Sequence, residues 1–260
     1  TQDQTGDILV SICCFTYNHE KFISEAIESF LCQQTSFKFE ILIHDDASTD
    51  QTPKIIEHYR KKNPNLIKTV LQKQNQYSKR PGSMLPFLLE KAAGKYLAIC
   101  DGDDFWYHNY KLEAQTQEMQ LYENCSMSFH NAYHLVDGEL NQDFFQISKK
   151  KILYQKDILR KHFIPTCSVM LSHEKLLKAR NMCRHIEEFP VGDIPMYILI
   201  TNFGPAINIE KYWSIYRCNI DSVTKSQQHL RGIRMKMIIM YARLMKHVLP
   251  SNVPFVFFKM

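Results

Sequence analysis

Three carboxylates follow one apolar segment of the sequence. Residues 96–100 (YLAIC) are all hydrophobic, and they lead directly into Asp101, Asp103 and Asp104, which surround Gly102. Carboxylates clustered at the end of a buried strand repel one another and lose hydration unless a cation or a polyhydroxyl ligand compensates them. Mg²⁺ and Mn²⁺ prefer carboxylate oxygen and commonly accompany phosphate, so the pattern indicates a metal-dependent nucleotide diphosphate site in which Gly102 leaves room for the ligand. An Asp-rich surface turn is the alternative.

Alternating strands and helices are predicted to position these carboxylates. Segments 8–15, 39–43 and 96–100 have the pattern of buried strands and 67–71 is a further predicted strand, while apolar residues at helical spacing indicate helices from about residues 22, 48 and 85. This order is typical of a doubly wound, mostly parallel α/β sheet flanked by helices, which binds ligands beyond the carboxyl ends of its strands. The polar residues expected there, besides the acidic segment, are Thr16, Tyr17, Asn18, Asp45, Asp46, Asn75 and Arg80. Neither a dinucleotide-binding G-x-G-x-x-G nor a P-loop motif is found.

Composition favours one soluble α/β domain with a C-terminal appendage. The chain has 260 residues, of which 45% are hydrophobic, and its eight cysteines form no C-x-x-C pair. Reduced core thiols, and therefore a cytoplasmic protein, are predicted. No secretory signal or long apolar span is present. The net charge of +5 is uneven, because basic residues gather near the C-terminus, which suggests that the two ends have different partners.

The C-terminal appendage is predicted to be a basic amphipathic helix. Residues 226–247 place apolar side chains on one helical face with Arg and Lys between them, so residues 225–260 are assigned to a helical extension. Packing against its own domain is one interpretation. The other is peripheral contact with an anionic bilayer on the inner face of the membrane, where the PFVFF segment adds apolar contact.

Four segments resemble the inverting family 2 glycosyltransferases with the GT-A fold. These are VSICCFTYN, EILIHDDASTD, GKYLAICDGDD with its D-x-D motif, and KLEAQ, and the resemblance is close over residues 8–125 and weaker to about residue 224. It implies a GT-A domain over 1–224, with a nucleotide-binding half at about 1–125 and an acceptor half at about 126–224. Such an enzyme moves a hexosyl or N-acetylhexosaminyl group from a nucleotide-diphosphate donor, with a UDP-sugar favoured, to a glycan or lipid-linked acceptor hydroxyl. Surface polysaccharide assembly is the expected context, and no nucleic acid partner is expected.

The resemblance also implies roles for individual donor-site residues. Tyr17 and Asp46 would hold a uracil-like base, Asp45 would support their loop, and Arg80 would approach the diphosphate. Asp101 would lie towards the ribose, and Asp103 would ligate the Mn²⁺ or Mg²⁺ that bridges the phosphates. Thr16, Asn75 and Gly102 complete the expected donor-binding set. The alternatives are that Tyr17 packs in the core, that Asp46 caps the second helix, and that Asn75 and Arg80 are solvated surface residues.

Inverting transfer needs a base to deprotonate the acceptor hydroxyl. Asp193 stands just before a predicted helix over 194–203, in the position that the family uses for this base, and is the catalytic candidate. A metal at Asp103 would stabilise the charge on the departing phosphate. An N-cap role for Asp193 is the structural alternative, and Glu187 and Glu188 are the alternative bases.

Two segments depart from the family pattern or stay ambiguous. Asn219 stands where family members commonly have a histidine, and it is not counted as a metal ligand because an amide oxygen is a poorer donor than imidazole. Residues 162–168 resemble an acceptor-side segment, with an interior strand as the alternative. Two other functions are weighed against transfer: a nucleotide-sugar binding module without turnover, and a nucleotidyltransferase, which would usually need a glycine-rich basic loop after the first strand.

Overall fold

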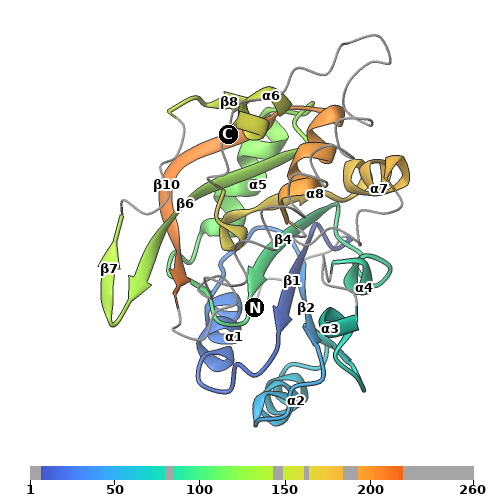
Figure 1. The fold of residues 1–260 in the computed structure, drawn as a ribbon, viewed down its shortest axis with the longest axis vertical. Coiled ribbons are helices and arrows are strands. Elements are labelled where there is room, and N and C mark those ends of the chain that lie inside the picture. Colours follow the sequence, from blue (N-terminus) through green and yellow to red (C-terminus); the bar gives the residue numbers. More distant parts are fainter. Residues whose placement is uncertain (1–6, 80–84, 143–148, 161–163, 184–192, 219–260) are drawn as a thin grey trace.

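A computed structural model describes residues 7–79, 85–142, 149–160, 164–183 and 193–218 (Figure 1). The strands are β1 Val10–Thr16, β2 Phe39–Asp45, β3 Ile67–Leu71, β4 Tyr96–Asp101, β5 Phe105–Trp106, β6 Met127–Val136, β7 Glu139–Asn141, β8 Ile152–Leu153, β9 Met170–Ser172 and β10 Ala206–Arg217. The helices are α1 Ile23–Leu31, α2 Thr52–Lys62, α3 Gln76–Lys79, α4 Pro86–Leu89, α5 Lys111–Leu121, α6 Gln155–Arg160, α7 His173–Met182 and α8 Asp193–Ile200, with 3₁₀ turns at Thr166–Ser168 and Thr201–Phe203.

The strands of the described segments join into one sheet, and its order confirms the predicted fold class. The order is β3-β2-β1-β4-β9-β6-β10-β5, with β7 beside β6 and β8 beside β10. Strands β3, β2, β1 and β4 are parallel, and β6 is parallel to β10, whereas β9 is antiparallel to both β4 and β6. The carboxyl ends of β1, β2 and β4 therefore open at one edge of the sheet.

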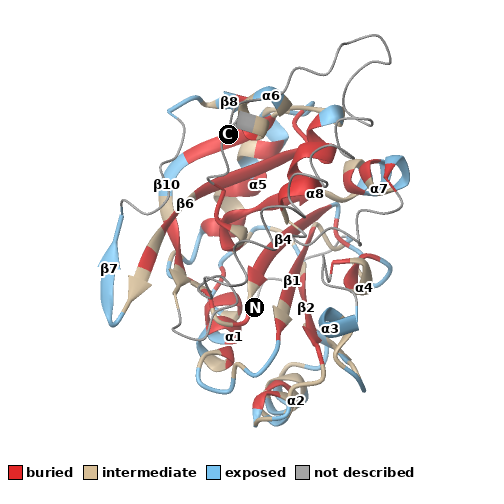
Figure 2. Cartoon of the chain, in the orientation of Figure 1, coloured by how far each residue is buried: buried red, intermediate tan, exposed pale blue. Residues whose placement is uncertain are grey.

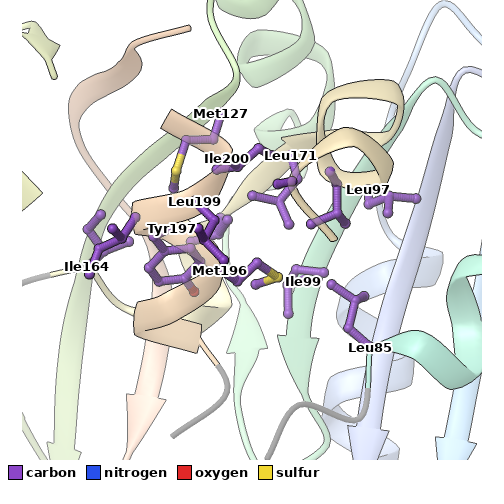
Figure 3. Packing of buried hydrophobic residues seen from close by; sticks show 14 of the residues in the cluster. Leu85, Leu97, Ile99, Met127, Ile164, Leu171, Met196, Tyr197, Leu199 and Ile200 are labelled. Atoms are coloured by element: carbon purple, nitrogen blue, oxygen red, sulfur yellow. The ribbon is translucent and has the colours of Figure 1, made fainter. Parts of the chain in front are cut away.

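The strands of this sheet are largely buried (Figure 2), and apolar side chains pack against both of its faces. Consecutive strand residues point to opposite faces, so Cys13 belongs to the cluster under α7 and α8, whereas Ile12 and Cys14 belong to the cluster under α1, α2 and α5. Figure 3 shows Tyr197 of α8 packed among apolar side chains that include Leu97 and Ile99 of β4. Helix α8 is fully buried from Ile194 to Ile200, which anchors the residue at its start, Asp193.

All eight cysteines are free, and six of them are buried, which agrees with the predicted core thiols. Among the described residues, no helix combines the length and apolar character that crossing a bilayer requires. The predicted extension at 225–260 lies outside the described residues.

Three local predictions are corrected. Helix α2 begins at Thr52 rather than near residue 48, because Asp50 Oδ1 accepts the Thr52 N–H at 2.9 Å and so ends the preceding loop there. The helix expected near 85–93 is a single turn, α4. Residues Thr166–Ser168 form a 3₁₀ turn rather than a strand, since Ser168 Oγ and its N–H both donate back to the Pro165 carbonyl, at 2.6 and 3.0 Å.

Candidate active site

A cleft of about 1160 Å³ opens where the loops after β1, β2 and β4 meet. Four residues of the predicted donor-binding set line it, namely Tyr17, Asp46, Asn75 and Asp103, and so does Asn18, which was expected at this edge of the sheet. The other lining residues were not singled out from the sequence, namely His19, Glu20, Lys21, Phe22, Asp50, Tyr77, Ser78, Leu135, Asp137, Gly138, Arg217 and Cys218. Thr16, Asp45, Asp101 and Gly102 are not among the lining residues. Arg80 lies outside the described residues.

Side-chain hydrogen bonds join the loop after β1 to the loop after β2. Ser48 Oγ accepts the backbone N–H of Asn18 at 2.8 Å, and Asn18 Oδ1 accepts the Thr49 N–H at 2.8 Å. Asp45 Oδ2 accepts the Ser48 N–H at 3.0 Å, so this carboxylate supports the loop from below. Asn18 and Ala47 adopt positive φ angles of 54° and 62°, which turn the two loops towards each other. Tyr17 stands beside this junction and is 43% exposed, so the core-packing alternative for its ring is wrong.

Asp46 is buried and holds a short helix at the wall of the cleft. Its Oδ1 accepts the Gln76 N–H at 2.7 Å and its Oδ2 accepts the Tyr77 N–H at 2.9 Å, both at the start of α3. The alternative that Asp46 caps α2 is therefore wrong, because both of its oxygens bond to α3 and the N-cap position of α2 is Gln51. Asn75 Oδ1 accepts the Ser78 N–H at 2.6 Å and supports the same turn.

Burial and mutual repulsion raise the pKa values of two carboxyls in the acidic loop. Desolvation, then the charges of Asp103 and Asp193, raise the pKa of Asp101 to about 8. Desolvation followed by the charges of Asp103 and Asp101 raises the pKa of Asp104 well above its usual range, although Asp104 Oδ1 accepts the Arg217 N–H at 2.8 Å. A cation at this loop would relieve the repulsion.

Gly102 is required by packing at the end of β1. A Cβ added there would lie 2.7 Å from Thr16 Oγ1 and 3.0 Å from Ile23 Cδ1, so the direction expected to admit a ligand is occupied by protein. Its N–H donates to the Phe15 carbonyl at 2.8 Å. The glycine therefore brings the acidic loop close to β1, and the carboxylate that reaches the cleft is that of Asp103.

Asp103 presents a metal-compatible oxygen to the cleft. Its side chain is 22% exposed, and its Oδ2 lies 3.9 Å from Nε2 of His19. No group of three His, Cys, Asp or Glu side chains in the described residues forms a complete cation site. One carboxylate fits a Mn²⁺ or Mg²⁺ whose remaining ligands are phosphate oxygens and water, which is how Mg²⁺ usually binds beside nucleotides. The donor set therefore fits a hard divalent ion that enters with a diphosphate.

Asp193 begins α8 and faces the same acidic loop. Its Oδ1 accepts the Ile194 N–H at 2.8 Å, and its Oδ2 accepts a hydrogen bond from Thr166 Oγ1 at 3.4 Å. Its charge adds to the burial that raises the pKa values of Asp101 and Tyr77, so the carboxylate lies within electrostatic reach of both β4 and α3. Glu187 and Glu188 lie outside the described residues.

His19, Tyr77 and Arg217 are among the cleft residues that sequence reasoning missed. His19 had a usable signal, because it directly follows Tyr17 and Asn18 in the loop after β1. Tyr77 had none, since α3 is four residues long and lies in a segment interpreted as loop. Arg217 ends β10, and its contacts with the acidic loop cross more than 100 residues, so no local pattern indicates them.

The chain belongs to glycosyltransferase family 2. The profile of the family described as "Glycosyl transferase family 2" matches residues 11–178, which include β1, the acidic loop and helix α5. This match confirms the family that the sequence motifs indicated.

One relative covers most of the chain. UDP-Glc:alpha-D-GlcNAc-diphosphoundecaprenol beta-1,3-glucosyltransferase WfgD of Escherichia coli is 32% identical over 222 residues, which are 85% of this chain and 81% of that protein. By contrast, the chain spans less than half, 46%, of the length of the first curated relatives that it matches, which are mycobacterial proteins.

Two solved structures share the fold. Staphylococcus aureus TarS 1–349 in complex with UDP has a TM-score of 0.66 at 18% identity, covering 95% of this chain and 67% of that one. Mannosyltransferase PcManGT of Pyrobaculum calidifontis, in complex with GDP-Man and Mn²⁺, has a TM-score of 0.64 at 18% identity, covering 96% and 67%. Both are similar to this chain in architecture, which confirms the GT-A fold.

Proposed function

We propose that this protein is a metal-dependent, inverting glycosyltransferase that uses a UDP-sugar. The observation that carries the proposal is that Tyr17, Asp46 and Asp103 line one cleft. The carboxylate of Asp193 is close enough to the acidic loop for its charge to raise the pKa of Asp101. The donor nucleotide would lie along the loops after β1 and β2, and its diphosphate would reach the acidic loop. The sugar would then project towards α8.

A uracil base is favoured for two reasons. WfgD, which matches 85% of this chain, is named for UDP-Glc, and the TarS structure contains UDP. On this chain, the exposed ring of Tyr17 provides a surface for stacking, and Asp46 orients the α3 turn that forms the opposite wall. The roles of Thr16, Asp45, Asn75, Arg80 and Asp101 in donor binding remain predictions of the same proposal.

Asp103 would hold the divalent ion, which supplies Lewis-acid stabilisation of the departing diphosphate. PcManGT, a structural neighbour, is in complex with Mn²⁺. The carboxylate of Asp103 carries the required oxygen ligand, while Asp101 and Asp104 shape the loop from beneath. Asp103 is thus the residue whose loss removes metal-dependent binding.

Asp193 would accept the proton of the attacking acceptor hydroxyl. A general base must lie within hydrogen-bonding reach of that hydroxyl while the leaving group departs from the opposite side of the anomeric carbon, which inverts its configuration. The buried helix α8 fixes Asp193 on a rigid element, and Thr166 holds one of its oxygens. The other oxygen accepts the Ile194 N–H, and the acceptor hydroxyl would bond to a remaining lone pair of the carboxylate.

A hydroxyl of a lipid-linked glycan is the proposed acceptor. WfgD is named for an acceptor carried on diphosphoundecaprenol. A protein that modifies such a lipid works at the membrane surface, so a peripheral position on the cytoplasmic face and a role in surface polysaccharide assembly belong to this proposal. Hexosyl transfer is favoured over N-acetylhexosaminyl transfer, again on the similarity to WfgD.

The decisive experiment measures UDP binding by calorimetry with and without Mn²⁺. Asp103→Ala is expected to lower the UDP affinity in Mn²⁺ by about two orders of magnitude and to leave the weaker metal-free binding unchanged, because it removes the only proposed protein ligand. Asp137→Asn is the matched control, since Asp137 lines the same cleft at a φ of 50° that Asn also tolerates. Equal Mn²⁺-dependent binding by wild type and Asp103→Ala would refute the proposal.

Turnover separates transfer from the other two functions. Incubation of the wild type with UDP-glucose, Mn²⁺ and a GlcNAc-diphospholipid is expected to release UDP. Binding of UDP-sugar without any UDP release would identify a binding module. Release of pyrophosphate from a nucleoside triphosphate would identify a nucleotidyltransferase.

A further inference from the structure

Arg217 connects the end of β10 to the acidic loop by two hydrogen bonds. Its backbone N–H donates to Asp104 Oδ1 at 2.8 Å, and its side-chain Nε donates to the backbone carbonyl of Asp103 at 2.8 Å. One bond satisfies a buried carboxylate and the other holds the main chain of the residue proposed to bind the metal. Neither bond uses the Asp103 carboxylate itself.

The guanidinium group of Arg217 is fixed on its remaining sides. Its Nη2 forms an ion pair with Glu25 Oε2 on α1, and its Cζ lies 4.9 Å from the ring centre of Phe22 and 5.0 Å from that of Phe105. The side chain is only 13% exposed. A planar cation in contact with two rings and bonded at two nitrogens has little rotational freedom, which a lysine ammonium cannot reproduce.

These contacts join three elements around one residue. Glu25 lies on helix α1 and Phe22 directly precedes it, the acidic loop provides Asp103, and β5 provides Phe105 directly after that loop. The Asp103 backbone is therefore held at its carbonyl oxygen, while its carboxylate stays 22% exposed in the cleft. A shift of about 1 Å in a ligand position is enough to weaken a metal site substantially.

We propose that Arg217 is a positioning residue that sets the direction of the Asp103 carboxylate, and that Glu25 in turn holds Arg217. The proposal rests on the proposed function of Asp103 as the metal ligand. Arg217 acts here through the backbone of Asp103, so its fork of nitrogen donors matters more than its charge.

The test measures Mn²⁺ binding in the presence of UDP by electron paramagnetic resonance, and thermal unfolding of each variant in parallel. Arg217→Met keeps the aliphatic packing and the backbone bond to Asp104, but loses the Nε bond to Asp103 and the ion pair with Glu25, and it is expected to weaken Mn²⁺ binding tenfold or more. Arg217→Lys keeps the charge that faces Glu25 but lacks Nε, and a similar loss is expected. Glu25→Gln keeps Arg217 and weakens its anchor, so a loss of about two- to threefold is expected.

Arg60→Met is the matched control, because Arg60 forms an equivalent ion pair with Glu57 on the outer face of α2 and does not line the cleft. It is expected to bind Mn²⁺ like the wild type. Wild-type affinity in Arg217→Lys would show that charge alone suffices and would overturn the proposal. If Arg217→Met fails to fold, Arg217→Lys and Glu25→Gln decide the question, and wild-type affinity in both overturns it.

Asp103→Ala in the same assay separates this inference from the proposed function. Unchanged Mn²⁺ binding by Asp103→Ala refutes the proposed function and the inference together. Loss of binding in Asp103→Ala with full binding in the Arg217 variants refutes the positioning role alone.

Discussion

The carboxylate of Asp46 accepts the backbone N–H of Tyr77 at 2.9 Å, across 31 residues of sequence. Its other oxygen accepts the Gln76 N–H, so one buried side chain begins α3 and fixes it against the end of β2. The phenol of Tyr77 then lies near the far part of the cleft, where the charge of Asp193 adds to burial in raising its pKa.

Asp46→Asn tests this connection, because an amide nitrogen cannot accept the second N–H. The expected results are a loss of about 1 kcal/mol in the free energy of unfolding, as for other lost caps, and a UDP affinity at least tenfold lower by calorimetry. Asp157→Asn serves as the control, since Asp157 Oδ2 accepts the Tyr154 N–H at 3.0 Å in a similar turn that is not part of the cleft. An equal loss of UDP affinity in both variants would contradict a local role for Asp46.

Asp193→Asn separates binding from chemistry. Donor affinity is expected to stay within twofold of the wild type, whereas kcat for transfer falls by about two or more orders of magnitude because the proton acceptor is lost. UDP release and UDP-sugar binding measured on the same preparation check both statements. Glu174→Gln on the outer face of α7 is the control carboxylate. Weakened donor binding with unchanged kcat would remove Asp193 from the catalytic role.

Gly102→Ala places a methyl group against Thr16 and Ile23. The contact distances of 2.7 and 3.0 Å are too short, so the acidic loop must move away from β1. Urea denaturation is expected to show a loss of about 1–3 kcal/mol, as for other overpacked sites, accompanied by weaker Mn²⁺-dependent UDP binding. Adding Thr16→Ala should recover part of both losses, and simple additivity in this double-mutant cycle would show that the clash is not with Thr16.

Lys111→Met is expected to stabilise the protein in a pH-dependent manner. The Lys111 ammonium is buried 3.8 Å above the Trp106 ring, without a hydrogen-bond partner among the described residues, and burial lowers its pKa to about 7 from 10.5. Below pH 7 the native state bears the full cost of a buried charge. Between pH 7 and 10.5 only the unfolded chain binds this proton, so the contribution of Lys111 to the free energy of unfolding rises with pH.

The methionine variant lacks this titration. We expect its free energy of unfolding to exceed that of the wild type by roughly 2–4 kcal/mol at pH 6, after the loss of the cation–π contact is included. The gain in the free energy of unfolding is expected to be smaller at pH 10. Urea unfolding at both values gives the comparison, and Lys54→Met on the exposed side of α2 controls for hydrophobicity. A gain that does not change with pH would show that Lys111 titrates normally.

Strands β1, β2 and β4 were predictable because parallel strands covered on both faces are largely apolar, and almost all residues of these three are buried. Segments 39–43 and 67–71 were located to within two residues of β2 and β3. Strand β9 was not predicted, since three residues, Met170–Ser172, carry no periodic signal and are held antiparallel between β4 and β6 by tertiary contacts alone.

The part of the candidate site formed by residues adjacent in sequence was predictable. The part formed by contacts between distant segments was not. Asp103 was identified because three carboxylates after an apolar strand are unusual. The Asp46 contact with α3 and the Arg217 contact with Asp103 cross 31 and 114 residues, and no local pattern encodes either of them. The cap of α2 was misassigned because Ser48 and Thr49 bond to Asn18 instead of starting the helix.

The hydrogen bonds of Asn18 with Ser48 and Thr49 affect the entropy cost of binding at the proposed nucleoside site. Two loops that already restrain each other in the empty protein leave little disorder for a ligand to remove. The contacts made by a base at Tyr17 would then contribute to affinity without an ordering penalty, in keeping with the general advantage of preorganised sites. Selectivity between nucleosides would therefore depend on two loops whose conformation is fixed before binding. Slow amide hydrogen exchange at Asn18 and Thr49, measured before any ligand is added, would indicate such rigidity.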